Sequence, residues 1–329
     1  MKRISLLILL ILSALLLVSC KDDKIQVGIL QFVAHQDLDD ARIGILEELE
    51  KAGFKDKDNI KVTLLNPQTD ASVMQSQAKQ LVRKSDILIG IATPAAVALV
   101  NEVKDQGKET PVIFTAVTDP VDAKLVESNK NPGGFVTGTS DMNPIDKQMS
   151  LVKRIKPDAK KVGILYTSSE PNSKVQADLA KDELLNIGFD LNDIVVKTLT
   201  DANDISQMIT SLTKDTDVIY IPSDNLISAS MGVIEESLMR NKDRGVPIIA
   251  TTTFQVEKGA SLTYGFSYLE LGRQTGVIVA RVLNGENPKN ISVETIKDVE
   301  LIINLKQLKE ELKIEVSNDL IEEAETIIE

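Results

Sequence analysis

The chain of 329 residues contains a single histidine, His35, in the segment VGILQFVAHQDLDDARIG (residues 27–44). It follows an apolar run and precedes a stretch with helical periodicity. An imidazole there can be a general base, a metal ligand or one wall of a binding site. The only cysteine, Cys20, lies in the N-terminal leader, so a zinc site would depend mainly on carboxylates, which is unusual. A catalytic triad would have to use His35, and no motif marks a nucleophile for it. We therefore interpret His35 as a neutral side chain on a cleft rim, with an exposed loop histidine as the alternative.

Polar side chains also follow the other apolar runs of the sequence. These segments are 31–36, 93–94, 115–120, 166–173, 223–225 and 251–253. Ligands of open parallel sheets bind at the carboxyl ends of the strands, where such segments converge. Thr93-Pro94, Asp119-Pro120 and Glu170-Pro171 also fit helix starts, and capping is the commoner role for any one of them. Six polar ends at one sheet edge together favour a binding site.

Signatures of common enzymes are absent from the sequence. It contains no GxSxG elbow, HExxH motif, phosphate-binding P-loop or glycine fingerprint for a dinucleotide. We therefore predict no catalytic residue, no metal site and no cofactor.

The elements that must position these polar ends occur twice along the chain. The matched residues are Gly28 with Gly163 and Gly53 with Gly188 (135 positions apart in each case), Asp86 with Asp217 (131) and Pro111 with Pro247 (136). Each half alternates short Val/Ile/Leu runs with amphipathic segments, which is typical of parallel sheets covered by helices on both faces. We predict an α/β fold of two similar doubly wound parallel-sheet lobes joined by a hinge.

The lobe boundaries follow from glycine-rich interruptions of this pattern. We expect the chain to cross between lobes near 136–142 and 259–267, and the tail has room for a third crossing. The first lobe then comprises residues 25–140 and about 264–298, and the second comprises 141–263 and about 299–329. A length above about 250–300 residues independently favours two cores.

The N-terminus has the pattern of a bacterial export signal. Lys2 and Arg3 precede an apolar run that ends in LVSC (residues 17–20), and polar residues follow at once. This ending resembles a lipobox, in which the cysteine is lipidated and becomes the new N-terminus. A buried cysteine in a membrane anchor is the alternative. We predict a signal peptide over 1–19, lipidation of Cys20 and a tether over 20–24.

The net charge of the chain, −12, makes it a poor ligand for nucleic acid, whose binding needs basic patches. With one cysteine the chain forms no internal disulfide, so outside the cytoplasm it must be stabilised by its packed core.

Several motifs resemble the solute-binding lipoproteins of bacterial ABC importers, and within them the subgroup assigned to tryptophan and related aromatic amino acids. They span most of residues 25–280: VGILQFVAHQDLDDARIG, IGIATPAAVALV, PVIFTAVTDPVDAKLV, VTGTSDM, VGILYTSSEPNS, VIYIPSDN and YGFSYLELGRQTG. SSEPNS and TAVTDPVDA are the most specific. The acidic run at 37–40 departs from the family, in which a less charged helix start is expected.

The resemblance implies a type I periplasmic-binding-protein fold that closes on its ligand, an ABC permease with its ATPase as partners, and attachment to the outer face of a bacterial membrane. From it and from the strand ends we predict ligand contacts by His35, Gln36, Thr93, Thr118, Asp119, Ser168, Ser169, Glu170, Asn172, Ser223, Asp224 and Asn225.

The type of ligand is indicated in part by composition. Sugar sites commonly stack rings on tryptophan, and this chain has none. A zwitterion needs an acceptor for its ammonium, which Asp224 or Glu170 can supply, and donors for its carboxylate, as at the helix start of Thr93. Three aromatic residues near strand ends either line a side-chain pocket or belong to the core: Phe32, Tyr166 and Tyr264.

We therefore predict a lipid-anchored, non-enzymatic receptor that delivers a small, aromatic amino acid to a permease. Two alternatives stay open: a sensor that presents its ligand-dependent surface to a signalling partner, and a carboxylate-dependent enzyme on the same scaffold. Paired acidic residues across the cleft would favour the enzyme.

Overall fold

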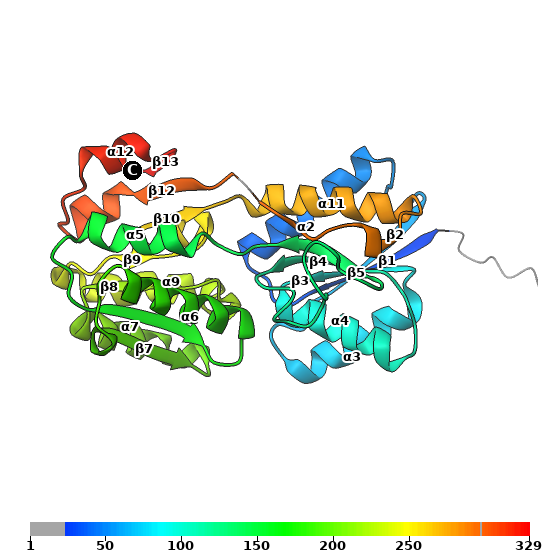
Figure 1. The fold of residues 1–329 in the computed structure, drawn as a ribbon, viewed down its shortest axis with the longest axis horizontal. Helices are drawn as coiled ribbons and strands as arrows, with labels where there is room; N and C mark the ends of the chain where they lie inside the picture. The colour runs from blue at the N-terminus through cyan, green and yellow to red at the C-terminus, as the bar shows by residue number, and fades with distance from the viewer. Residues whose placement is uncertain (1–23, 297) are drawn as a thin grey trace, which may run out of the picture.

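A computed structural model describes residues 24–296 and 298–329, which form two lobes side by side (Figure 1). The predicted signal peptide and Cys20 lie outside the described residues. None of the described helices combines the length and apolar character needed to cross a membrane.

The first lobe is built on a six-stranded sheet of order β11-β5-β4-β3-β1-β2. Its strands are β1 (Ile25–Gln31), β2 (Ile60–Leu65), β3 (Ile87–Ile91), β4 (Val112–Val117), β5 (Val136–Ser140) and β11 (Glu294–Thr295). Its helices are α2 (Gln36–Lys51), α3 (Ala71–Lys84), α4 (Thr93–Asp105) and α11 (Tyr268–Leu283). All the described strand pairs of this sheet are parallel. Helices α2 and α11 lie on one face of the sheet and α3 and α4 on the other (Figure 1).

The second lobe has a seven-stranded sheet of order β13-β12-β10-β9-β8-β6-β7. Its strands are β6 (Val162–Thr167), β7 (Ile194–Leu199), β8 (Val218–Tyr220), β9 (Ile248–Ile249), β10 (Leu262–Gly265), β12 (Glu300–Asn304) and β13 (Thr326–Ile328). Its helices are α5 (Ile145–Ile155), α6 (Pro171–Asn186), α7 (Ile205–Asp215), α8 (Asn225–Ser228), α9 (Met231–Arg240), α10 (Thr253–Glu257) and α12 (Asn318–Glu323). Among the described strand pairs of this sheet, only that of β12 with β10 is antiparallel. The predicted fold of two parallel-sheet lobes is confirmed.

Short helical turns complete the connections. They are η1 (Leu191–Asp193), η2 (Ala202–Asp204), η3 (Lys242–Arg244), η4 (Pro288–Asn290) and the π-helical turn η5 (Gln307–Glu311).

The repeat seen in the sequence is repeated in the hydrogen bonds. Gly53 and Gly188 follow α2 and α6 with φ of 91° and 96°, a left-handed conformation that glycine adopts without steric cost. Just before β3, the Asp86 N–H donates to the Gln26 carbonyl of β1 (2.8 Å), and the Asp86 carboxylate accepts from the Gln26 N–H. Just before β8, Asp217 makes the same pair of contacts with Lys161, the residue that precedes β6 (2.8 Å for the backbone bond). The two halves therefore share strand order and loop chemistry.

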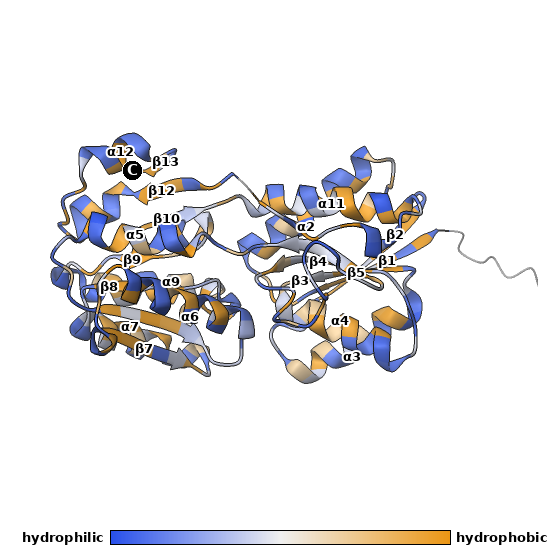
Figure 2. Ribbon diagram, in the orientation of Figure 1, coloured by the Kyte–Doolittle hydropathy of each residue, from blue (hydrophilic) through white to orange (hydrophobic). Residues whose placement is uncertain are grey.

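Each lobe buries its own hydrophobic cluster. The change from one cluster to the other falls between Tyr264, which packs in the second lobe, and Phe266, which packs in the first. Figure 2 shows hydrophobic and hydrophilic residues alternating around the helices, as expected for helices that cover a sheet. Separate cores let the lobes move relative to each other as rigid bodies.

Two segments of the described chain pass between the lobes, 141–144 and 266–267 (Figure 1), and a third connection joins β11 of the first sheet to β12 of the second. The first two lie at the glycine-rich interruptions of the sequence. Strand β10 stays in the second sheet through Gly265, so its last residues lie just beyond the predicted change of lobe at about 264.

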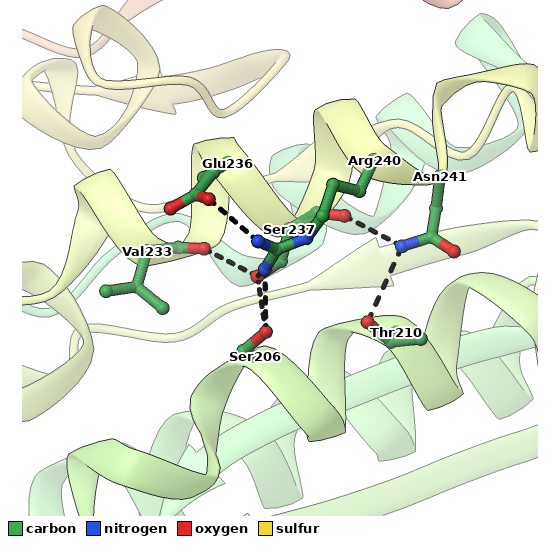
Figure 3. A network of polar contacts seen from close by, with 7 residues as sticks. All are labelled: Ser206, Thr210, Val233, Glu236, Ser237, Arg240 and Asn241. Carbon is green, nitrogen blue, oxygen red and sulfur yellow. Dashed lines mark hydrogen bonds and ion pairs between the residues drawn. The ribbon is translucent and has the colours of Figure 1, made fainter.

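In the second lobe, polar contacts join α7 to α9 (Figure 3). The buried Ser237 hydroxyl donates to the Val233 carbonyl (2.7 Å) and lies 3.0 Å from the Ser206 hydroxyl, to which Arg240 also donates (2.8 Å). These contacts fix α9 against α7 in the second lobe.

Candidate functional site

A buried cavity lies between the lobes, at the carboxyl ends of their strands. It is lined by His35, Asp37, Leu38, Ala116, Asp141, Asn172, Ser223, Asp224, Asn225, Ser228, Thr252 and Tyr268. Its volume is about 20 Å³, which holds one water-sized group. None of these lining residues is a lysine or arginine, so the cavity is acidic.

The first lobe contributes the start of α2. His35 is the N-cap residue of this helix, and its side chain does not cap the helix. Of the acidic run that follows, Asp39 pairs with Arg42 (3.0 Å), whereas Asp37 lies in the cavity with 5% of its surface exposed. Burial raises the pKa of Asp37 to about 7, the contact with Thr252 of the second lobe opposes this, and nearby carboxylates add to it.

The second lobe contributes the ends of β6 and β8. Asp224 caps α8 by accepting from the Ile227 N–H (3.0 Å) and also accepts from the Thr167 N–H (2.6 Å) and hydroxyl (2.8 Å). Glu170 accepts from the backbone N–H groups of Asn225 and Leu226 (3.0 Å each). Burial raises the pKa of both carboxyls. These contacts give Asp224 the capping role that is the alternative to ligand binding.

One amide connects the two lobes across the cavity. Asn225 donates its side-chain N–H to Glu170 (2.5 Å), and its Oδ1 lies 3.3 Å from His35 Nε2. The His35 ring also stacks on Phe254 of α10, with centroids 6.5 Å apart. Burial lowers the pKa of His35 to about 4, so the imidazole is neutral near pH 7, as predicted from the sequence.

The first crossing segment closes the remaining side of the cavity. Asp141 accepts from the Tyr268 hydroxyl (2.7 Å) and the Thr118 hydroxyl (3.1 Å), and Asn143 donates to Ser223 Oγ (2.9 Å). Burial raises the pKa of Asp141, and the two hydroxyl donors oppose this.

Five of the residues predicted as ligand contacts line the cavity: His35, Asn172, Ser223, Asp224 and Asn225. Two others contact lining residues, since Glu170 binds Asn225 and Thr118 binds Asp141.

The other five predicted contacts do not line the cavity. Gln36, Ser168 and Ser169 are exposed, and Asp119 is half-buried with its Oδ1 accepting from two backbone N–H groups of the following turn (3.0 Å each). Thr93 is buried at the start of α4, and its hydroxyl has no hydrogen-bond partner among the described residues.

Several lining residues were not selected from the sequence, namely Asp37, Leu38, Ala116, Asp141, Ser228, Thr252 and Tyr268. Signals for some were present. Thr252 and Ala116 lie in polar strand ends, and Asp37 begins the acidic run at 37–40.

The aromatic residues near the cavity are not those considered from the sequence. Phe32 lies in the core of the first lobe, Tyr166 packs against that of the second, and the Tyr264 hydroxyl accepts from Arg154 (2.8 Å). The lining aromatic residue is Tyr268, which stacks on Phe266 with centroids 5.4 Å apart.

Within residues 24–296 and 298–329, no group of three or more His, Cys, Asp or Glu side chains is arranged to hold a metal ion. The carboxylates of the cavity instead accept hydrogen bonds from backbone, hydroxyl and amide groups.

Comparison with known proteins shows the family to which the chain belongs. Residues 26–328 match the family described as ABC transporter substrate binding protein. A curated relative, the "Tyrosine-binding protein" of Clostridioides difficile (strain R20291), is 42% identical over 86% of this chain and 79% of its own length.

Two solved structures show related lobe arrangements. The ABC domain from Streptococcus pneumonia in complex with L-Trp is 35% identical, with a TM-score of 0.86 over 93% of this chain and 100% of that one. The ligand-free, open structure of a substrate binding protein with adhesive properties from Clostridium difficile is 38% identical, with a TM-score of 0.68 over 93% of this chain and 99% of that one. At similar identity, the lobes here are arranged more like those of the complex than those of the open structure.

Proposed function

Because the chain belongs to the family of ABC transporter substrate-binding proteins, we propose that it binds an aromatic amino acid between its lobes and delivers it to a membrane permease. The observation that carries this proposal is the buried cavity that both lobes line with polar side chains. The names of two relatives, one tyrosine-binding and one in complex with L-Trp, support the choice of an aromatic ligand. Tryptophan, phenylalanine and tyrosine are the candidates.

Binding of such a ligand requires the lobes to separate. A cavity of about 20 Å³ is far too small for an amino acid, whereas typical ligand pockets have volumes of about 300–1,000 Å³. The three crossing segments and the separate cores permit a hinge motion that opens the cavity to solvent. Contacts such as that of His35 with Asn225 would break on opening and re-form around the ligand.

The predicted contacts divide into two roles in this proposal. His35, Asn172, Ser223 and Asn225 touch the ligand from the cavity wall. Thr93 binds the ligand carboxylate, because its unpaired hydroxyl lies at the N-terminus of a 13-residue helix, where backbone N–H groups and the helix dipole favour an anion. Ala92, which precedes it, donates to Thr115, next to the lining residue Ala116.

Calorimetry with the purified full chain in mild detergent tests the ligand. We expect saturable binding of tyrosine, tryptophan or phenylalanine, and no binding of glucose or leucine at the same concentrations. The ligand that binds should also raise the melting temperature, since it binds only the folded state. Binding of glucose in preference to all three aromatic amino acids would refute the proposal.

An enzyme on this scaffold is the second candidate, because Asp37 and Asp224 line one cavity from opposite lobes. Acid–base chemistry needs carboxylates that can exchange protons with the substrate, and the oxygens of Asp224 already accept three hydrogen bonds from Thr167 and Ile227. We therefore favour binding without turnover. Mass spectrometry of the ligand after prolonged incubation should recover it unchanged.

Members of this family act outside the cytoplasm, and we further propose that Cys20 anchors the chain to the membrane by a lipid. The apolar run that ends in LVSC supports this. Replacement Cys20→Ser should move the protein from the membrane fraction to the soluble fraction while its lobes stay folded and bind ligand. Retention of the variant in the membrane to the wild-type extent would refute lipidation.

A further inference from the structure

Three residues that line the cavity carry a buried polar atom without a hydrogen-bond partner among the described residues. They are His35 with Nδ1, Asp37 with Oδ2 and Asn172 with Oδ1. Buried polar atoms are rarely left unpaired in folded proteins, because each costs free energy. His35 and Asp37 belong to the first lobe and Asn172 to the second, so residues that carry unpaired atoms line one cavity from both sides.

All three atoms are acceptors. Asn172 donates its side-chain N–H to the Ser223 carbonyl (2.9 Å), which can only accept, so its unpaired atom is the carbonyl oxygen. Asn225 donates to Glu170 (2.5 Å), so its Oδ1 faces His35 and accepts the proton of Nε2. The neutral His35 ring then carries a lone pair on Nδ1.

Asp37 differs in this respect from the other acidic residues at the cavity. Asp141 has a hydroxyl donor on each oxygen, from Tyr268 and Thr118. As described above, the oxygens of Glu170 and Asp224 accept from the backbone and side chains of their own lobe. Only Asp37 keeps a carboxylate oxygen unpaired among these four described residues.

We propose that Asp37 binds the primary ammonium group of the amino acid, with His35 Nδ1 and Asn172 Oδ1 as the other two acceptors. A primary ammonium has three N–H donors, which matches three unpaired acceptors around one cavity. This assignment rests on the proposed function and deepens it, because it makes Asp37 the residue that recognises an α-amino acid. It replaces Glu170 and Asp224 as the acceptor of the ammonium.

The electrostatics of the cavity point the same way. No lysine or arginine is among the lining residues, so a ligand ammonium is the cation that compensates their charge. Burial raises the pKa of Asp37 to about 7, and a bound cation would favour its ionised form. The carboxylate of the ligand would meet only hydrogen-bond acceptors at these three atoms. The ligand therefore binds with its ammonium toward α2 and its carboxylate away from it.

The test compares tyrosine with 3-(4-hydroxyphenyl)propionic acid, which lacks only the ammonium, by calorimetry at pH 7.5 on the full chain in mild detergent. Wild type should bind the analogue at least ~30-fold more weakly than tyrosine, as expected when one partner of a buried charged pair is missing. Asp37→Asn should lose at least ~30-fold in affinity for tyrosine and little for the analogue, so the preference should disappear.

Asp40→Asn is the matched control, because Asp40 lies on the same helix, has the same side chain and does not line the cavity. This variant should keep the preference for tyrosine within about threefold of wild type, since the Asp40 side chain lies outside the cavity and acts on Asp37 only through space. Melting curves establish that both variants are folded.

Three results would overturn the inference. An Asp37→Asn variant that binds tyrosine like wild type would exclude the contact with the ammonium. Equal losses for tyrosine and the analogue would make Asp37 a structural residue. A wild-type chain that binds no aromatic amino acid would overturn the proposed function and the inference together.

Discussion

At equivalent positions beside the cleft, the two lobes carry side chains of different chemistry. His35 and Glu170 are 135 positions apart, the spacing of the internal repeat, and they are the N-cap residues of the equivalent helices α2 and α6. Neither side chain caps its own helix, and both instead contact Asn225. The repeat therefore supplies a matching pair of positions, and one amide of the second lobe contacts both.

The lobes differ in how they use their carboxylates. In the second lobe, Glu170 and Asp224 hold the ends of β6 and β8 together by accepting from backbone N–H groups. In the first lobe, Asp37 follows the equivalent strand end and keeps one oxygen unpaired. We infer that one lobe uses its buried acids to fix its loops, whereas the other leaves an acid for the ligand.

The largest effect at a single pH is expected from Glu170→Ala, which removes the acceptor of the Asn225 and Leu226 N–H groups. Each buried donor left unpaired costs about 1–3 kcal/mol, so we expect the free energy of unfolding to fall by about 3 kcal/mol. Chemical unfolding of the unliganded protein measures this.

Glu170→Gln is the control, because it keeps one acceptor oxygen and should cost clearly less than the alanine variant. If either variant kept its stability and lost much of its tyrosine affinity, Glu170 would be an acceptor of the ligand ammonium. The second lobe would then use its carboxylate for the ligand and not for its loops.

A more gradual effect is expected in the pH dependence of stability. The pKa of Asp37 rises from 3.8 to about 7 on folding, so the folded chain holds a proton that the unfolded chain has released. The stability that this proton contributes is present below about pH 4 and is lost as the pH rises to about 7. Within that window the loss approaches about 1.4 kcal/mol per pH unit.

Unfolding of wild type and Asp37→Asn at a series of pH values measures this difference, and the other buried carboxyls cancel because both proteins contain them. The stability of wild type relative to the variant should decline from about pH 4 to about 7 and then stay constant. With saturating tyrosine the decline should shrink, because the ammonium favours the ionised carboxylate. A difference that is independent of pH without ligand would mean that Asp37 is not buried in solution.

Much of the fold could be predicted because its signals are local. Gly53 and Gly188 end equivalent helices, and Asp86 and Asp217 begin equivalent strands, so both the elements and their repetition are visible in the residue order. Strand ends are also local features, which explains why residue order alone identifies Asn172, Ser223 and Asn225 as residues of the cleft.

Whether a side chain points into the cavity or into solvent could not be predicted from residue order. Ser168 and Ser169 follow a strand end and are nevertheless exposed, whereas Asp37, in a run that suggests a solvated helix start, is buried. Tyr268 reaches the cavity from a helix more than 200 residues later than His35. Such convergence requires the packing of α11 beside α2, which backbone-to-backbone contact at Gly44 and Gly272 makes possible.

The sequence by itself determined the two-lobed α/β architecture, because hydrophobic periodicity and glycine positions act over a few residues. It also determined the acidic, amide-rich chemistry of the cleft. Only the tertiary structure decided which acid keeps an unpaired oxygen, because folding determines which hydrogen-bond donors reach each carboxylate. For Asp224 those donors are supplied by Thr167 and Ile227, and for Asp37 one oxygen receives none among the described residues.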